Sequence, residues 1–225
     1  MHPLQSLRFD LPCLAAAAAA CLLLPPAARA QVALAEVLYD PAGSDDELEW
    51  IELVNEGETP VDLASWSLGW GGASWAGDRV ALTGVIEPGQ HFVVGGPRSA
   101  AENASPVLDL PLDFEADLQN SGATADGVAL FDVPVAEVGA ETLPVSVVVY
   151  GGENTSGLFD ETGAVASVDV GDAPGGSSIE RGDDGVWRVQ AAPTPGAPPQ
   201  PVPEPARFVL AAAATAALVG VRRAR

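Results

Sequence analysis

The chain has 225 residues, and all ten of its basic side chains are arginines, because the sequence contains no lysine. Asp and Glu together number 31, which gives a formal net charge of −21 at pH 7. This charge excludes an ordinary nucleic-acid-binding protein, which needs a cationic face, and argues against docking on an anionic membrane surface. Apolar residues make up 48% of the chain, so it is not an acidic disordered tail.

The first thirty residues have the features of a secretory signal peptide. Arg8 precedes an apolar run over residues 11–24, and Ala28 and Ala30 form a small-x-small cleavage site. An uncleaved membrane helix is the alternative. However, a helical run of this length spans only about 21 Å, less than the roughly 30 Å of a hydrocarbon core. We therefore predict that a signal peptidase cleaves after Ala30 and that the protein is exported.

Both cysteines, Cys13 and Cys21, lie inside this predicted signal. The mature protein is therefore expected to contain no cysteine and to be stabilised by its core without disulfides. A lipoprotein cysteine at position 21 is a minor alternative, since small residues precede it but three leucines follow it.

The C-terminal end combines two segments that we expect to lie outside the fold. Residues 193–205 are rich in proline, which is typical of an extended spacer. Residues 206–225 are mostly apolar and end in arginines. An apolar helix followed by basic residues stops in a membrane with its basic end on the cytoplasmic side. We therefore predict transient or permanent membrane insertion through this helix.

The order of motifs in this tail is distinctive. Pro203, Glu204 and Pro205 precede the apolar run, and Arg222 and Arg223 follow it. This arrangement resembles a PEP-CTERM sorting signal. The resemblance implies that an exosortase-like enzyme recognises the Pro-Glu-Pro motif, removes the helix and releases or re-anchors the protein outside the cell. A plain single-pass anchor is the alternative. The expected location is the extracellular space or the cell envelope, with inner-membrane association before or instead of processing.

Residues 31–192 are expected to form one all-β domain. No stretch keeps a 3.6-residue apolar period over three turns, and short β-prone runs alternate with Gly, Pro, Asn and Asp clusters. The expected strands cover residues 32–39, 48–54, 66–68, 80–82, 91–94, 128–133, 145–150, 164–170 and 186–189. This spacing favours a β-sandwich, with residues 95–125 as a loop over its surface.

Several segments of this domain, taken in order, resemble a lamin tail domain of the bacterial type. They are the runs VALAEVLYDP, EWIELVN, VDLASWSL and IEPGQHFVV, followed by a closing segment with SSIER, a tryptophan and PTPG. The resemblance implies an immunoglobulin-like β-sandwich and a secreted or envelope-linked protein. The expected function is structural or adhesive. Residues 97–124 and 153–161 fit this pattern poorly and are candidates for insertions.

The EWIEL run predicts which of its side chains are buried. We expect Trp50, Ile51 and Leu53 in the core of the sandwich, where large apolar side chains supply the buried area that a disulfide-free domain needs. Glu49 and Glu52 are expected outside the sheet or at its edge.

Three further tryptophans have different expected positions. Trp66 is predicted to pack on the opposite sheet. Trp70 and Trp75 lie in a glycine-rich segment, residues 69–77, which is not expected to hold a strand. These two side chains either fold back as a lid on the core or stand exposed as a stacking platform for sugars or partner proteins. The lid is the preferred interpretation.

The sequence offers no recognisable catalytic set. His91 is the only histidine after the predicted signal, and there is no Gly-x-Ser-x-Gly motif and no cysteine nucleophile. One histidine without cysteine is also too little for a typical zinc site. We therefore predict that the protein is not an enzyme. A hydrolase that uses surface carboxylates is a weak alternative.

Calcium is the strongest candidate among bound ions. Asp40, Asp45, Asp46 and Glu47 cluster in one predicted loop, and Ca²⁺ is bound by six to eight oxygen atoms. There is no EF-hand spacing, so a solvated acidic surface is the competing interpretation. No other cofactor is expected. A calcium- or carbohydrate-binding surface module is accordingly the alternative function, and extracellular polysaccharide or envelope proteins are the expected partners.

Overall fold

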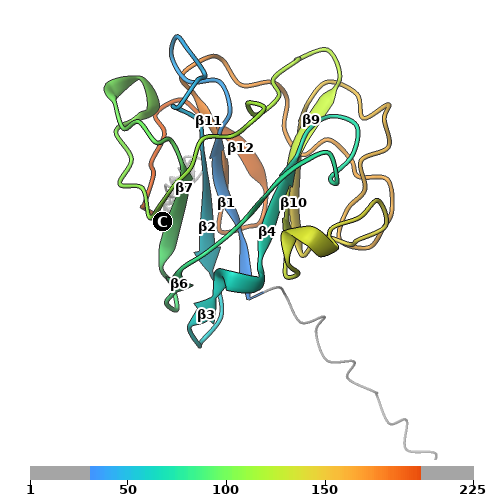
Figure 1. Cartoon of the computed structure of the whole chain (residues 1–225). Helices are drawn as coiled ribbons and strands as arrows, with labels where there is room; N and C mark the ends of the chain where they lie inside the picture. The colour runs from blue at the N-terminus through green and yellow to red at the C-terminus, as the bar shows by residue number, and fades with distance from the viewer. Residues whose placement is uncertain (1–30, 199–225) are drawn as a thin grey trace, which may run out of the picture.

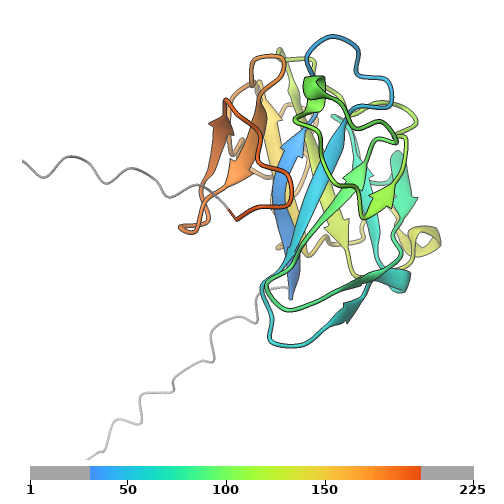
Figure 2. The same cartoon turned by 90° about the vertical axis from the view of Figure 1, so that its left-hand side faces the viewer.

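A computed structural model describes residues 31–198 of the chain. Two β-sheets face each other with the core between them, as Figures 1 and 2 show. This arrangement confirms the predicted all-β, immunoglobulin-like β-sandwich. Within residues 31–198, no helix is long and apolar enough to span a membrane. The predicted signal peptide and the predicted C-terminal helix both lie outside the described residues.

The larger sheet has six strands in the order β12-β11-β1-β2-β7-β8. All neighbours are antiparallel except β7 and β8, which are parallel. The bounds are β1 Val32–Leu38, β2 Trp50–Asn55, β7 His91–Gly95, β8 Leu110–Pro111, β11 Ser178–Arg181 and β12 Trp187–Gln190. The N-terminal strand β1 thus pairs with β11, which lies far along the chain, so the last strands close the same sheet that the first strand begins.

The smaller sheet has four antiparallel strands in the order β10-β9-β4-β5. Its bounds are β4 Ser67–Trp70, β5 Asp78–Ala81, β9 Ala125–Phe131 and β10 Ser146–Gly151. A separate two-stranded ribbon joins β3 (Val61–Asp62) to β6 (Val85–Ile86). Three single turns of 3₁₀ helix complete the secondary structure: η1 Leu63–Ser65, η2 Ala101–Asn103 and η3 Val135–Glu137.

Strands β1 and β2 are covered on both faces. Every residue of β1 is buried, including the two small alanines, Ala33 and Ala35. On the inner face, Ile51 and Leu53 of β2 join the main core, as predicted. On the outer face, Trp50 forms a separate small cluster with Leu38 and other apolar side chains. Trp50 is therefore fully buried, but it lies on the side of the sheet away from the main core.

The segment expected to be a surface loop, residues 95–125, takes part in the core. Phe114 and Leu118 belong to the main core cluster. Asn103 is fully buried, and its carbonyl oxygen accepts a hydrogen bond of 3.0 Å from Trp50 Nε1. The expectation of a simple surface excursion is wrong, because the outer face around Trp50 needs a cover and this segment provides it.

Two expectations about strands and side chains also need correction. Residues 164–170 form only isolated bridges, because their backbone groups bond to the edge of β10 and to the preceding loop. Glu49 and Glu52 are buried, with 2% and 1% of their surface exposed, and not outside the sheet. Trp66 packs against the core, as predicted, and is half-buried.

We expect that shortening a side chain of the inner face destabilises the domain strongly. Ile51→Ala should lower the free energy of unfolding by about 2–5 kcal/mol, because it removes buried methyl groups and leaves a cavity. Val107→Ala is the matched control, since Val107 is 84% exposed, and should stay within about 0.5 kcal/mol of the unmodified protein. Urea denaturation followed by tryptophan fluorescence measures both. Equal effects of the two changes would contradict the assigned core.

Candidate functional site

The outer face of the six-stranded sheet carries a row of three glutamates. Glu36 of β1 lies directly opposite Glu180 of β11 on one side and opposite Glu52 of β2 on the other. A register irregularity in β1 precedes Glu36. Glu36 and Glu52 each have only 1% of their surface exposed. Like charges directly opposite each other destabilise a sheet, so this row needs hydrogen-bond donors to be tolerated.

The donors come from residues 193–198, which we call the strap. The backbone N–H of Thr194 donates to the Glu36 carboxylate at 3.1 Å, and its hydroxyl donates to the same group at 3.1 Å. The hydroxyl also reaches Glu180 at 3.3 Å, and the backbone N–H of Gly196 donates to Glu52. The proline-rich segment was expected to be a spacer outside the fold. Its first residues instead bind to the sheet, because the buried carboxylates require its donors.

Two further side chains complete this network. The Ser178 hydroxyl of β11 donates to Glu36, and His91 Nδ1 of β7 lies 2.5 Å from a Glu52 oxygen. Burial, with a smaller contribution from the neighbouring Glu180 and Glu52 carboxylates, raises the pKa of Glu36 to about 7, although the Ser178 and Thr194 donors act to lower it. The strap is thus joined by side chains to three adjacent strands, and through His91 to a fourth.

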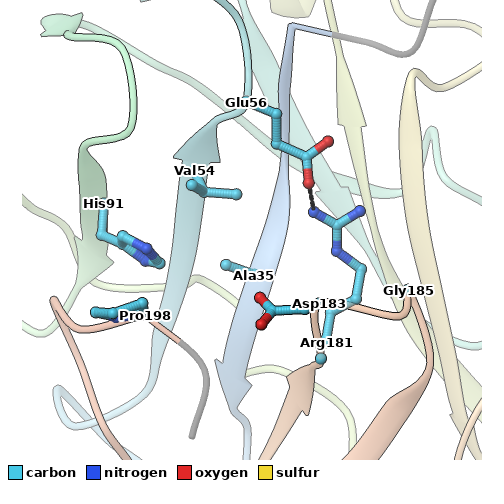
Figure 3. Close-up of a pocket in the computed structure, with 9 residues that line it drawn as sticks. Ala35, Val54, Glu56, His91, Arg181, Asp183, Gly185 and Pro198 are labelled. Carbon is cyan, nitrogen blue, oxygen red and sulfur yellow. Dashed lines mark hydrogen bonds and ion pairs between the residues drawn. The ribbon is translucent and has the colours of Figure 1, made fainter. Parts of the chain in front are cut away.

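A groove of about 250 Å³ opens beside the strap on this outer face. Its apolar wall includes Ala35, Val54 and Pro198, the last of these from the strap. Figure 3 shows His91 and Pro198 on one side and the ion pair of Arg181 with Glu56 across from them. The described residues of the lining are Ala35, Val54, Glu56, His91, Arg181, Gly182, Asp183, Gly185 and Pro198.

The described residues that line this groove supply no hydroxyl or thiol nucleophile. None of them is a serine, threonine or cysteine, and the Nδ1 atom of His91 faces Glu52. The arrangement can hold a short segment of chain against an apolar wall with one ion pair at the far side. It supports binding more than a reaction.

Comparison with models of protein families identifies the family of this chain. The lamin tail domain model matches residues 25–172. The chain belongs to the lamin tail domain family. Lamin tail domains are immunoglobulin-like modules that are generally not enzymes. No curated protein matches the chain in a sequence search. In this lamin tail domain, β11, β12 and the strap follow the matched region, although β11 pairs directly with β1.

The loop proposed to bind calcium is held by its own chain. The Asp40 carbonyl oxygen accepts a hydrogen bond from Gly176, and that of Asp45 accepts one from Leu48. Glu47 lies 4.0 Å from Arg98, and Asp46 is exposed. Across residues 31–198, no three Asp, Glu, His or Cys side chains meet in a group that could hold a metal ion. The structure therefore gives this loop no assembled metal site.

Glu49 is an unusual buried carboxyl group at the end of the same loop. One of its oxygens accepts a hydrogen bond of 2.8 Å from the Leu118 N–H, while the other, Oε1, has no partner among the described residues. Burial, together with the nearby charges of Asp117 and Asp45, raises the pKa of Glu49 to about 9. Glu49 is therefore a neutral acid at pH 7, which is how its buried position is tolerated.

Trp70 and Trp75 are the two side chains for which a lid and a platform were the alternatives. Both are buried, with 2% and 1% of their surface exposed, and their indole N–H groups donate to the carbonyl oxygens of Ala116 and Phe159. The platform is thus wrong, and the segment folds back. A Cβ atom at position 69 would lie 2.3 Å from the Trp75 carbonyl oxygen. Only a glycine at this position therefore lets the backbone of Trp75 approach the strand so closely.

The processing residues predicted from the sequence lie outside the described part of the chain. They are Ala28, Ala30, Pro203, Glu204, Pro205, Arg222 and Arg223. The sequence did not predict the strap. Two features could have indicated it: a glutamate inside the apolar VALAEVL run, and the PTPG sequence near the end of the domain.

We expect the Thr194 hydroxyl to stabilise the strap. Thr194→Val keeps the backbone N–H but removes the donor to Glu36 and Glu180, and should lower the free energy of unfolding by about 1–3 kcal/mol. Hydrogen exchange of the strap should become faster. Thr83→Val is the control, since Thr83 is exposed and far from the strap in sequence. Unchanged exchange in the Thr194 variant would show that the strap is held by other contacts.

The raised pKa of Glu49 predicts a pH dependence of stability. The ordinary pKa of 4.5 applies to the unfolded chain, so between pH 4.5 and about 9 the folded state holds a proton that the unfolded state has lost. The contribution of Glu49 to the free energy of unfolding should therefore be fully present below pH 4.5 and be lost as the pH rises toward 9. Glu49→Gln should flatten this fall and be more stable than the unmodified protein at pH 8. Thermal unfolding from pH 5 to 9 measures both, and parallel profiles would refute the assignment.

Proposed function

We propose that this lamin tail domain protein is of the bacterial type and acts as an exported, non-catalytic structural or adhesive module of the cell envelope. Its N-terminal segment is the export signal. Its C-terminal segment is a PEP-CTERM-like sorting signal, processed by an exosortase-like enzyme. The observation that carries the proposal is the strap, because it attaches the chain to the sheet immediately before the proposed sorting motif.

The position of the strap supports an attached or load-bearing role. Gly196 bonds to Glu52, and the proposed motif begins at Pro203, seven residues later. A chain that leaves a sandwich through an unbound end would pull first on an edge strand. Here the strap distributes its contacts over β11, β1 and β2 by way of Glu180, Glu36 and Glu52. A module held through its C-terminal end would transmit force into the middle of its larger sheet.

The use of the buried acids supports a non-catalytic role. Catalytic carboxyl groups with raised pKa values usually face a cleft that substrate can enter. Glu36 and Glu49 both have raised pKa values, but each accepts hydrogen bonds from the protein's own chain. These two carboxyl groups therefore stabilise the positions of a loop and of the strap. The proposed partners are extracellular polysaccharide or envelope proteins.

Chain length limits the distance between the domain and the membrane before processing. Nine residues, and so ten Cα-to-Cα steps, separate Pro198 from Phe208, near the start of the apolar run. At no more than about 3.6 Å per residue, this connection spans at most about 36 Å in any conformation. An unprocessed protein would therefore keep its folded domain close to the membrane surface, where a membrane-embedded processing enzyme can reach the motif.

Intact mass of the protein from its native host, measured for each cell fraction, tests this proposal. We expect an extracellular species that begins at Gln31 and ends near Pro205. Glu204→Ala should retain the C-terminal helix in the membrane fraction, while Gln200→Ala should be processed normally. A full-length protein from Met1 to Arg225 in the cytoplasmic fraction would overturn export. A membrane species that always ends at Arg225 would overturn processing and leave a plain anchor.

A further inference from the structure

Two of the four sheet edges in the described part of the sandwich are closed, and a third is flanked by a 3₁₀ turn. On the β10 edge, the Val147 and Val149 N–H groups donate to the carboxylates of Glu161 and Asp169, both at 2.9 Å. The β8 edge consists of two residues, one of which is Pro111, which has no N–H. The 3₁₀ turn η3 lies beside β5 at the other edge of the smaller sheet. Closed edges of this kind prevent pairing with other chains.

The fourth edge, β12, is open. The Gly182 N–H bonds to the Val186 carbonyl oxygen at 3.0 Å, which sets the alternation of hydrogen bonds between β11 and β12. By this alternation, the backbone groups of Trp187 and Val189 point away from β11. Among residues 31–198, no other element bonds to the backbone of either residue. Figure 2 shows the β11–β12 hairpin at the margin of the sandwich with no further strand beside it.

The surface around this edge is suited to contact. Val186 and Val189 have 49% and 42% of their surface exposed, so two apolar side chains flank the open backbone groups. Beneath the edge, between β12 and the loop that covers β10, lies a cleft of about 330 Å³. Trp187 forms part of its wall, and its lining carboxylates are Asp160, Glu161 and Asp169 against one arginine, Arg181. The cleft is therefore acidic.

We propose that β12 is a docking edge for an extended peptide segment of a partner protein that carries basic side chains at alternate positions. The segment would pair with the free backbone groups of Trp187 and Val189 as an added strand. In a strand, every second side chain points to the same face, so one set would enter the acidic cleft. This inference concerns a partner and does not depend on the proposed export or sorting.

Charge distinguishes this partner from a second copy of the chain. Each copy carries a net charge of −21, so two copies that approach edge to edge repel each other. The one arginine of β12, Arg188, is paired with Asp184 of the same hairpin. A basic peptide meets an attractive field at the same edge.

Fluorescence polarisation with two labelled ten-residue peptides tests the proposal on the full-length protein in neutral detergent. The probe alternates threonine and lysine, and the matched control alternates threonine and glutamate. We expect the lysine peptide to bind at least tenfold more tightly, with affinity that falls as salt rises. N-methylation of alternate backbone nitrogens in the probe should abolish binding. Equal binding of the two peptides, or binding that N-methylation leaves unchanged, would overturn the proposal.

Two sets of variants locate the interaction. Val189→Pro removes a backbone N–H that points away from β11 and should weaken binding at least tenfold, while Val189→Thr keeps the N–H and should bind normally. Glu161→Gln with Asp169→Asn keeps the acceptors for β10 and removes two charges, so it should weaken the lysine peptide at least threefold even if the proline variant fails to fold. Unchanged binding in the charge variant would overturn the acidic cleft as the site. Dimers of the unmodified protein that Val189→Pro abolishes would instead assign the edge to a second copy.

Discussion

The structure depends on covering the outer face of β1 and β2. In a β-sandwich, one face of each sheet packs on the other sheet, and the opposite face normally meets water. Here every residue of β1 is buried, so its outer face needs a second layer. The segment around Asn103 covers Trp50 in one part, and the strap covers the glutamate row in another. These two covers come from a long inter-strand connection and from the C-terminal end of the domain.

The glutamate row makes the strap cover specific. An apolar outer face would accept any apolar segment, whereas Glu36 and Glu52 require donors at fixed positions. Thr194 and Gly196 supply backbone N–H groups that no strand pairing uses. Burial raises the pKa of Glu36 to about 7, so this carboxyl group is partly protonated at neutral pH and places less negative charge in the protein interior. The same property places the stability of the domain under the control of pH.

The strong negative charge of the chain has two separate consequences. Inside, burial raises the pKa values of Glu36 and Glu49, and neighbouring acids add to the rise, so these side chains need protons or donors. Outside, acids close one sheet edge and line a cleft beside another. Glu161 and Asp169 bond to N–H groups of β10, and both also line the cleft near β12. Charge thus blocks association at one edge and selects a basic partner at the neighbouring one.

The sequence alone determined the fold class and part of the inner core, because short apolar runs such as VALAEVL are local patterns that report burial in a strand, and the order of its motifs indicated the family by resemblance. It also indicated that Trp70 and Trp75 fold back. Only the tertiary structure decided that Glu36, Glu49 and Glu52 are buried, that residues 95–125 reach the core, and that the strap lies on the sheet. Each of these depends on segments far apart in the chain, such as Glu36 and Thr194, and no local periodicity records which donor will meet a given acid. Strand pairing across the fold, β1 with β11 above all, creates the site.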